Sequence, residues 1–203
     1  MLQAWAALML ALFATCAYSA SKTVLVLGDS LSAGYGLPAD TGWVSLLEQR
    51  LAHDHLAAHI VNASISGETS SGGRTRLPQL LAQYRPSVVV IELGANDGLR
   101  GLPLGATRAN LQAMIDAAKQ AKAQVLLVGM QIPPNYGHVY TEQFRSLFPA
   151  VAHRNHVALV PFLLEGIAGD PQLFQADRLH PTAQAQPVLL NNVWPELKTL
   201  LAR

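Results

Sequence analysis

Short apolar runs alternate with longer amphipathic stretches along the 203 residues of this chain. The apolar runs are rich in Val, Ile and Leu, which is typical of strands buried on both faces of a sheet. The stretches between them have the spacing of amphipathic helices. The predicted strands are residues 23–28, 58–63, 87–93, 123–129 and 156–161, and the predicted helices lie near residues 41–54, 73–84, 105–121, 139–154 and 182–201.

This alternation predicts an α/β fold in which a parallel sheet is covered by helices on both faces. Half of the residues are hydrophobic, and the length suits one domain with a sizeable core, residues 20–203. In such folds ligands bind at the carboxyl ends of the strands. The loops that follow the strands should therefore carry the functional residues.

The first 21 residues differ from the rest because they carry no charged side chain. An apolar run followed by small residues is typical of a secretory signal peptide, and Ala17-Tyr18-Ser19 fits the small-x-small cleavage rule. We therefore expect residues 1–19 to be a signal peptide, with cleavage about residues 19–21 and a periplasmic or secreted product. The alternatives are an uncleaved membrane anchor, because the run is near the length that spans a bilayer, and a lipoprotein attached through Cys16.

The net charge and the cysteine content limit the binding partners and the catalytic groups that this chain can have. The formal charge of +1 gives no indication of nucleic-acid binding. Cys16 is the only cysteine, so a mature chain would lack a cysteine nucleophile and cysteine-ligated metals. We expect a monomer without cofactors and without stable membrane insertion of the mature chain.

Four of the five loops that follow the predicted strands contain residue types that acyl transfer needs. Ser30 is a candidate nucleophile, His180 a candidate base and Asp177 its orienting partner, because a serine hydroxyl must be activated. The spacing of three residues places Asp177 and His180 on one side of a turn, and we expect Pro181 to begin the last helix. The backbone of Ser30 and Gly67 and the amide of Asn96 are candidate donors for an oxyanion.

The segments "GDSLSAGYG", "NASISGETS", "ELGANDGLRG" and "DRLHPTAQAQP" resemble the four sequence blocks of the SGNH (GDSL) hydrolases, in order and over residues 23–190. Within that family the chain is similar to periplasmic multifunctional enzymes with thioesterase, protease, lysophospholipase and arylesterase activities. The resemblance implies a flavodoxin-like, three-layer α/β/α sandwich with a mostly parallel five-stranded sheet, and no metal. It also implies Ser30 as nucleophile, Asp177 and His180 completing a triad, and Ser30, Gly67 and Asn96 forming the oxyanion hole.

Other polar residues in these loops favour structural interpretations. Ser30 alone could be a helix N-cap and Asn96 part of a turn. We expect Asp29 to brace its loop by hydrogen bonds, Ser32 and Asp97 to be structural, and Gly72-Gly73 to loosen the start of the helix after the second strand. The group His53, His55 and His59 is not expected to hold a metal, because no cysteine or carboxylate completes a ligand set.

Apolar side chains also lie in the strand-end loops, where they either pack on the fold or line an acyl-chain groove. They are Leu99, Leu102, Ile132, Pro133, Pro134 and Tyr136. A groove predicts a serine esterase or thioesterase that hydrolyses aryl esters, acyl-CoA or lysophospholipids through an acyl-enzyme. The alternatives are a carbohydrate O-deacetylase on the same scaffold and a non-catalytic module that binds a lipid or glycan.

Overall fold

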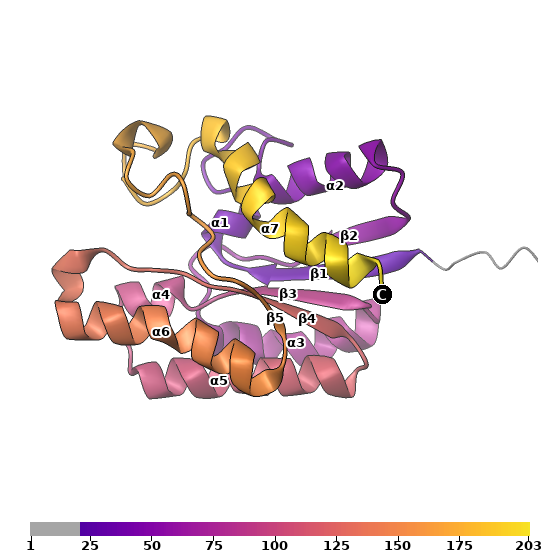
Figure 1. The fold of residues 1–203 in the computed structure, drawn as a ribbon, viewed down its shortest axis with the longest axis horizontal. Helices are drawn as coiled ribbons and strands as arrows, with labels where there is room; N and C mark the ends of the chain where they lie inside the picture. Colours follow the sequence, from indigo (N-terminus) through magenta and orange to yellow (C-terminus); the bar gives the residue numbers. More distant parts are fainter. Residues whose placement is uncertain (1–20) are drawn as a thin grey trace, which may run out of the picture.

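A parallel five-stranded sheet forms the centre of the computed structural model, which describes residues 21–203 (Figure 1). Its strands are β1 (Lys22–Gly28), β2 (Ala58–Asn62), β3 (Val88–Glu92), β4 (Gln124–Val128) and β5 (Ala158–Val160). Their order across the sheet is β2-β1-β3-β4-β5, and every neighbouring pair is parallel. The predicted strands are confirmed, whereas the predicted signal peptide lies outside the described residues.

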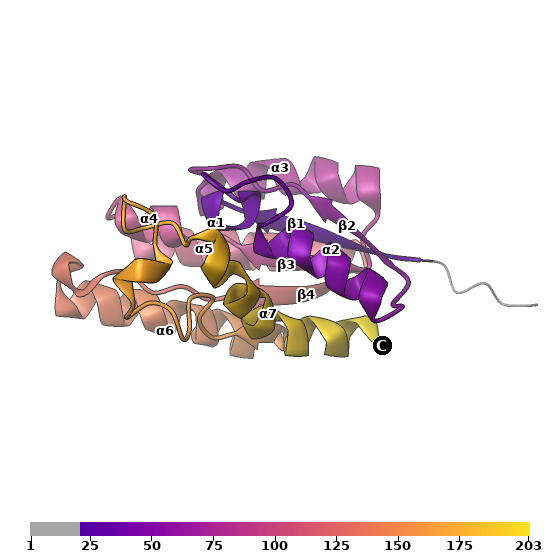
Figure 2. The same ribbon diagram turned by 90° about the horizontal axis from the view of Figure 1, so that it is seen from above.

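Helices cover both faces of the sheet, as predicted, and make a three-layer sandwich (Figures 1 and 2). The helices α2 (Trp43–His53) and α7 (Gln186–Leu201) pack together on one face. On the other face lie α3 (Ser70–Tyr84), α5 (Leu104–Gln120) and α6 (His138–Asn155). Among residues 21–203, none of the helices has the length and apolar character needed to cross a bilayer.

The first strand lies inside the sheet and anchors the residues that follow it. Its residues Val24, Leu25, Val26 and Leu27 are fully buried between the two helix layers. Burial of one such side chain contributes about 1.5–3 kcal/mol to stability. The backbone that enters the loop after β1 is therefore held firmly, which is what a precisely placed side chain at residue 30 requires.

Two short helices at the strand ends were not predicted: α1 (Ser30–Ala33) directly follows β1, and α4 (Ala95–Leu99) follows β3. Helices this short contain too few residues to show an apolar periodicity. Each is preceded or followed by a glycine with positive φ, Gly94 before α4 and Gly34 after α1. These helices bring Ser30 and Asn96 to the same edge of the sheet.

The prediction that Gly72-Gly73 loosens the start of a helix is wrong. Helix α3 already begins at Ser70, and the Thr69 hydroxyl caps it by accepting the N–H of Gly72. Gly73 lies inside the helix, and a β-carbon at this position would overlap the side chain of Leu93. This glycine therefore allows close packing of α3 against the sheet.

The last helix begins later than predicted, at Gln186 rather than Pro181. Pro181 instead pairs with Phe174 in an isolated antiparallel bridge, and the N–H of Gln175 donates to the His180 carbonyl at 2.8 Å. A 3-10 turn (Ala183–Ala185) then leads into α7. The bridge satisfies backbone groups of the His180 loop that a helix beginning at Pro181 would have to satisfy in another way.

Candidate active site

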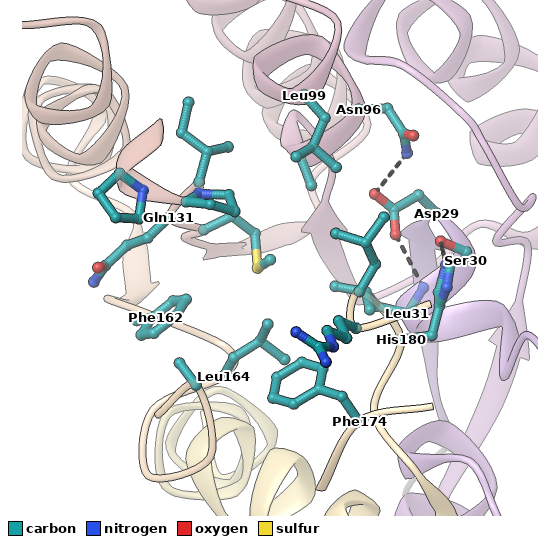
Figure 3. A pocket seen from close by; sticks show the side chains of 18 residues that line it. Asp29, Ser30, Leu31, Asn96, Leu99, Gln131, Phe162, Leu164, Phe174 and His180 are labelled. Carbon is teal, nitrogen blue, oxygen red and sulfur yellow. Dashed lines mark hydrogen bonds between the residues drawn. The ribbon is translucent and has the colours of Figure 1, made fainter. Parts of the chain in front are cut away.

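The candidate residues gather where the parallel strands end, although they come from distant parts of the chain. Ser30 begins α1 after β1, Gly67 lies in the loop after β2, and Asn96 lies in α4 after β3. Asp177 and His180 lie in the segment between β5 and α7. Figure 3 shows Ser30, Asn96 and His180 around one opening, with Asp29 between Asn96 and the start of α1.

Ser30, His180 and Asp177 form a continuous hydrogen-bonded chain. His180 Nε2 lies 2.9 Å from Ser30 Oγ, and His180 Nδ1 lies 2.6 Å from Asp177 Oδ2. Tyr35 packs against the imidazole with ring centroids 4.5 Å apart. The carboxylate fixes a proton on Nδ1, so Nε2 is left free to accept the serine proton.

The Asp177 carboxylate also folds the loop that carries His180. Its Oδ1 accepts the backbone N–H groups of Leu179 at 2.9 Å and His180 at 3.0 Å. These hydrogen bonds, together with the His180 imidazole, lower the pKa of Asp177 from 3.8 to about 2. The carboxylate thus stays ionised at neutral pH. Inside the same turn, Arg178 adopts a left-handed backbone with φ of 57°.

Three groups are candidate hydrogen-bond donors to an oxyanion. The backbone N–H groups of Ser30 and Gly67 have no acceptor within residues 21–203, and Gly67 has a φ of 79°. Arg100 donates to the Gly67 carbonyl at 2.9 Å and so holds the Gly67–Glu68 peptide, which follows the peptide that carries the Gly67 N–H. Arg100 was not singled out from the sequence, because a contact with a backbone carbonyl leaves no sequence motif.

The third donor is the Asn96 amide, whose orientation is fixed by two groups that can only accept hydrogen bonds. Asn96 Nδ2 donates to Asp29 Oδ2 and to the Glu68 carbonyl, both at 3.0 Å. Asp29 is nearly fully buried and also accepts the N–H of Leu31 at 3.0 Å. Burial raises the pKa of Asp29 to about 6. The expected bracing role of Asp29 is thus visible in its contacts with α1 and α4.

Glu92, at the end of β3, lies fully buried beneath the nucleophile loop and was missed from the sequence. Its Oε2 accepts the Ser32 hydroxyl at 2.7 Å and the Asp29 N–H at 3.3 Å, whereas Oε1 has no partner in the described chain. Gly28 makes room for this carboxyl, since a β-carbon there would lie 2.7 Å from it. Burial, reinforced by the charge of Asp29, raises the pKa of Glu92 well above 4.5.

Glu92→Gln is expected to stabilise the protein increasingly as the pH rises. A raised pKa favours folding fully below the unfolded value of 4.5, and this stability is lost as the pH rises toward the folded pKa. Glutamine keeps the acceptor for Ser32 and Asp29 but does not titrate. The advantage in Tm should grow by roughly 3 °C per pH unit within that interval. Thermal melts of both proteins between acid and alkaline pH would measure it; an equal Tm difference at every pH would contradict a protonated Glu92.

Two further polar residues, Asp97 and Ser32, form buried hydrogen bonds that position the short helices of the site. Asp97 accepts hydrogen bonds from the Ser70 N–H at 2.8 Å and from the Thr107 hydroxyl at 3.1 Å, which ties α4 to α3 and α5. Ser32 is engaged by Glu92, as described. No group of three His, Cys, Asp or Glu side chains in the described chain is arranged to hold a metal, and His53 instead contacts Asp54.

A cavity of about 390 Å³ opens beside Ser30 and His180 (Figure 3). Of the six apolar residues considered from the sequence, Leu99, Ile132, Pro133 and Pro134 line it. Leu102 and Tyr136 do not, and they are 36% and 39% exposed. The Leu102 carbonyl instead accepts the Tyr140 hydroxyl, which holds that loop against α6. The lining also includes side chains that the sequence did not single out: Met130, Phe162, Leu164, Phe174, Leu179 and Arg178.

The chain is similar to known proteins over most of its length. Residues 26–186 match the model of the GDSL-like Lipase/Acylhydrolase family. The chain is 52% identical to Esterase TesA of Pseudomonas aeruginosa, over 95% of this chain and 96% of that protein. It is 41% identical to Thioesterase 1/protease 1/lysophospholipase L1 of Escherichia coli K12, over 90% of this chain and 86% of that protein. A crystal structure of TesA has a TM-score of 0.86 and 53% identity, covering 88% of this chain and 99% of that one.

Proposed function

Because the chain belongs to the GDSL-like lipase/acylhydrolase family, we propose that it is a serine hydrolase of carboxylic esters and acyl thioesters. The substrate class includes aryl esters, acyl-CoA and lysophospholipids, in keeping with the names of its relatives. The observation that carries the proposal is the hydrogen-bonded chain Ser30–His180–Asp177 at the mouth of an apolar cavity.

The reaction begins when His180 Nε2 takes the proton of Ser30, whose oxygen attacks the acyl carbonyl. The distance of 2.9 Å between these atoms suits direct proton transfer. His180 then gives the proton to the leaving alcohol or thiol, and an acyl-enzyme remains. Water, deprotonated by the same imidazole, attacks the acyl-enzyme. His180 then returns the proton to the Ser30 oxygen as the acid leaves. Asp177 stabilises the imidazolium that forms in each step.

The oxyanion of each tetrahedral intermediate is stabilised by the N–H groups of Ser30 and Gly67. The Asn96 amide joins them by exchanging one of its two hydrogen bonds, to Asp29 or to the Glu68 carbonyl, for one to the oxyanion. Donors that are already oriented stabilise developing charge without reorganisation, and one such donor accounts for roughly a hundredfold to a thousandfold in rate. Arg100 holds the carbonyl of Gly67, and Asp29 holds the Asn96 side chain, through the hydrogen bonds described above.

The cavity favours acyl-chain substrates over acetylated sugars. Its lining is mainly Leu, Ile, Pro, Phe and Met side chains, which would contact an alkyl chain but offer few hydrogen bonds to a sugar. A carbohydrate O-deacetylase would be expected to have a more polar site. A non-catalytic binding module has no need for the aligned Ser30, His180 and Asp177 chain.

The test is hydrolysis of p-nitrophenyl esters from acetate to palmitate by residues 20–203, together with release of acetate from acetylated xylan. We expect turnover of medium and long acyl chains and little release of acetate. Preference for acetylated xylan would favour the deacetylase. Absence of hydrolysis throughout, with binding of lipid or glycan, would favour the non-catalytic module.

Leu99→Asp is expected to lower kcat/KM for p-nitrophenyl palmitate about tenfold more than for the acetate, because a carboxylate in the cavity opposes burial of a long chain. Leu102→Asp is the matched control, since Leu102 lies outside the cavity lining. Steady-state kinetics on both esters measure the effect. Equal losses on the two esters in Leu99→Asp would argue against an acyl groove at this position.

We further propose that residues 1–19 are removed during export and that the mature enzyme is a periplasmic monomer. The apolar first segment and the small residues that follow it support the proposed export and cleavage. N-terminal sequencing of the protein recovered from the periplasm would test it, and an intact N-terminus in the membrane fraction would favour an anchor.

A further inference from the structure

We propose that Arg178 binds the phosphate group of lysophospholipid substrates and so determines specificity for them. The inference rests on the proposed ester hydrolysis, because it concerns the leaving group of that reaction. Arg178 lies between Asp177 and His180 and lines the same cavity as Ser30. The Arg178 side chain is therefore accessible to a substrate that occupies this cavity for attack by Ser30.

The guanidinium of Arg178 is free to take an anion. Within residues 21–203 it forms no salt bridge and no side-chain hydrogen bond. Its neighbour Asp177 forms no salt bridge with it, because that carboxylate points to His180 and to the backbone of Leu179. Arg100, in contrast, is committed to the Gly67 carbonyl.

The turn itself does not require an arginine at residue 178. Its φ of 57° lies in the left-handed region, which glycine adopts without a steric penalty. The turn exists because Asp177 accepts the N–H groups of Leu179 and His180, and glycine would serve that geometry better.

A cation beside an apolar cavity matches an amphiphile that has an acyl chain and a nearby anionic group. Arginine presents planar, paired N–H donors that fit phosphate oxygens. In a lysophospholipid only the glycerol backbone separates the phosphate from the ester. In acyl-CoA the whole pantetheine arm lies between the thioester and the phosphates. Because Arg178 and Ser30 line one cavity, the short separation fits better.

The experiment compares three substrates with the same acyl chain, each below the concentration at which it forms micelles. They are lauroyl lysophosphatidylglycerol, monolauroylglycerol, which lacks the phosphate, and lauroyl-CoA. In Arg178→Gln the ratio of kcat/KM for the lysophospholipid to that for monolauroylglycerol should fall about tenfold. Arg178→Lys should retain part of the preference, because it keeps the charge but not the paired donors.

Arg85→Gln is the matched control. Arg85 is exposed, has a φ of 42° and ends α3 at the amino end of β3, away from the cavity. Its variant should leave the substrate ratio unchanged. An unchanged ratio in Arg178→Gln, or a fall confined to lauroyl-CoA, would overturn the inference. Failure of the parent to hydrolyse any of the three substrates or p-nitrophenyl esters would instead overturn the proposed function itself.

Discussion

Ser30→Ala is expected to lower kcat for p-nitrophenyl octanoate about a millionfold, because the variant has no oxygen to form the acyl-enzyme. Ser30 Oγ is the atom that lies 2.9 Å from the candidate base. The donors for the oxyanion stay in place, so some catalysis over water should remain. Single-turnover kinetics and mass spectrometry after treatment with a fluorophosphonate would measure turnover and covalent labelling together.

Ser32→Ala is the informative control, because the motif contains two serines close together. The Ser32 hydroxyl donates to the buried Glu92 carboxyl and is 3% exposed. Its loss should reduce stability by about 1–3 kcal/mol because the buried Glu92 carboxyl loses its shorter hydrogen bond, while fluorophosphonate labelling persists. Labelling of Ser30→Ala, or loss of labelling in Ser32→Ala with an unchanged fold, would contradict the assignment of the nucleophile.

The second large effect is expected for Asp177→Asn, which should lower kcat about 10,000-fold. The asparagine oxygen can still accept the N–H groups of Leu179 and His180, so the turn survives. Its NH2 group, however, would donate to His180 Nδ1 and leave the ring proton on Nε2. That tautomer cannot take the proton of Ser30.

The measurement is kcat with a matched thermal melt at neutral pH. Asp116→Asn on α5 is a suitable control, because it makes the same change in a carboxyl group that accepts only a surface hydrogen bond from Gln112. The control should keep the parental kcat. A loss of less than tenfold in Asp177→Asn would show that His180 does not depend on this carboxylate.

The sequence allowed prediction of the strands and of the residues that follow them. Buried strands such as Val24 to Leu27 form continuous apolar runs, and in a parallel sheet their ends must meet at one edge. Ser30, Asn96 and His180 could therefore be placed together even though they are far apart in the chain. The family blocks added the specific roles now proposed for them.

Features that depend on three-dimensional packing could not be predicted. Glu92 lies in an apolar strand, and its role as a hydrogen-bond acceptor for Ser32 and Asp29 is visible only in the folded structure. Gly73 resembled a helix breaker until its contact with Leu93 was known. The late start of α7 follows from the bridge between Phe174 and Pro181, which joins residues that no local pattern connects. Leu102 and Tyr136 lie in loops whose apolar side chains can face either the cavity or solvent.

The nucleophile and its base are anchored in different ways. Ser30 follows directly from a buried strand, whereas His180 lies on a long segment whose backbone hydrogen bonds run mostly within the segment, such as Gln175 to the His180 carbonyl and Thr182 to the Leu173 carbonyl, with few to the rest of the fold. Segments held by few hydrogen bonds open locally at lower free energy than the core. The sheet can thus stay folded while the segment that carries His180 detaches. We therefore expect heat to inactivate the enzyme by a reversible, partial unfolding at temperatures below the Tm.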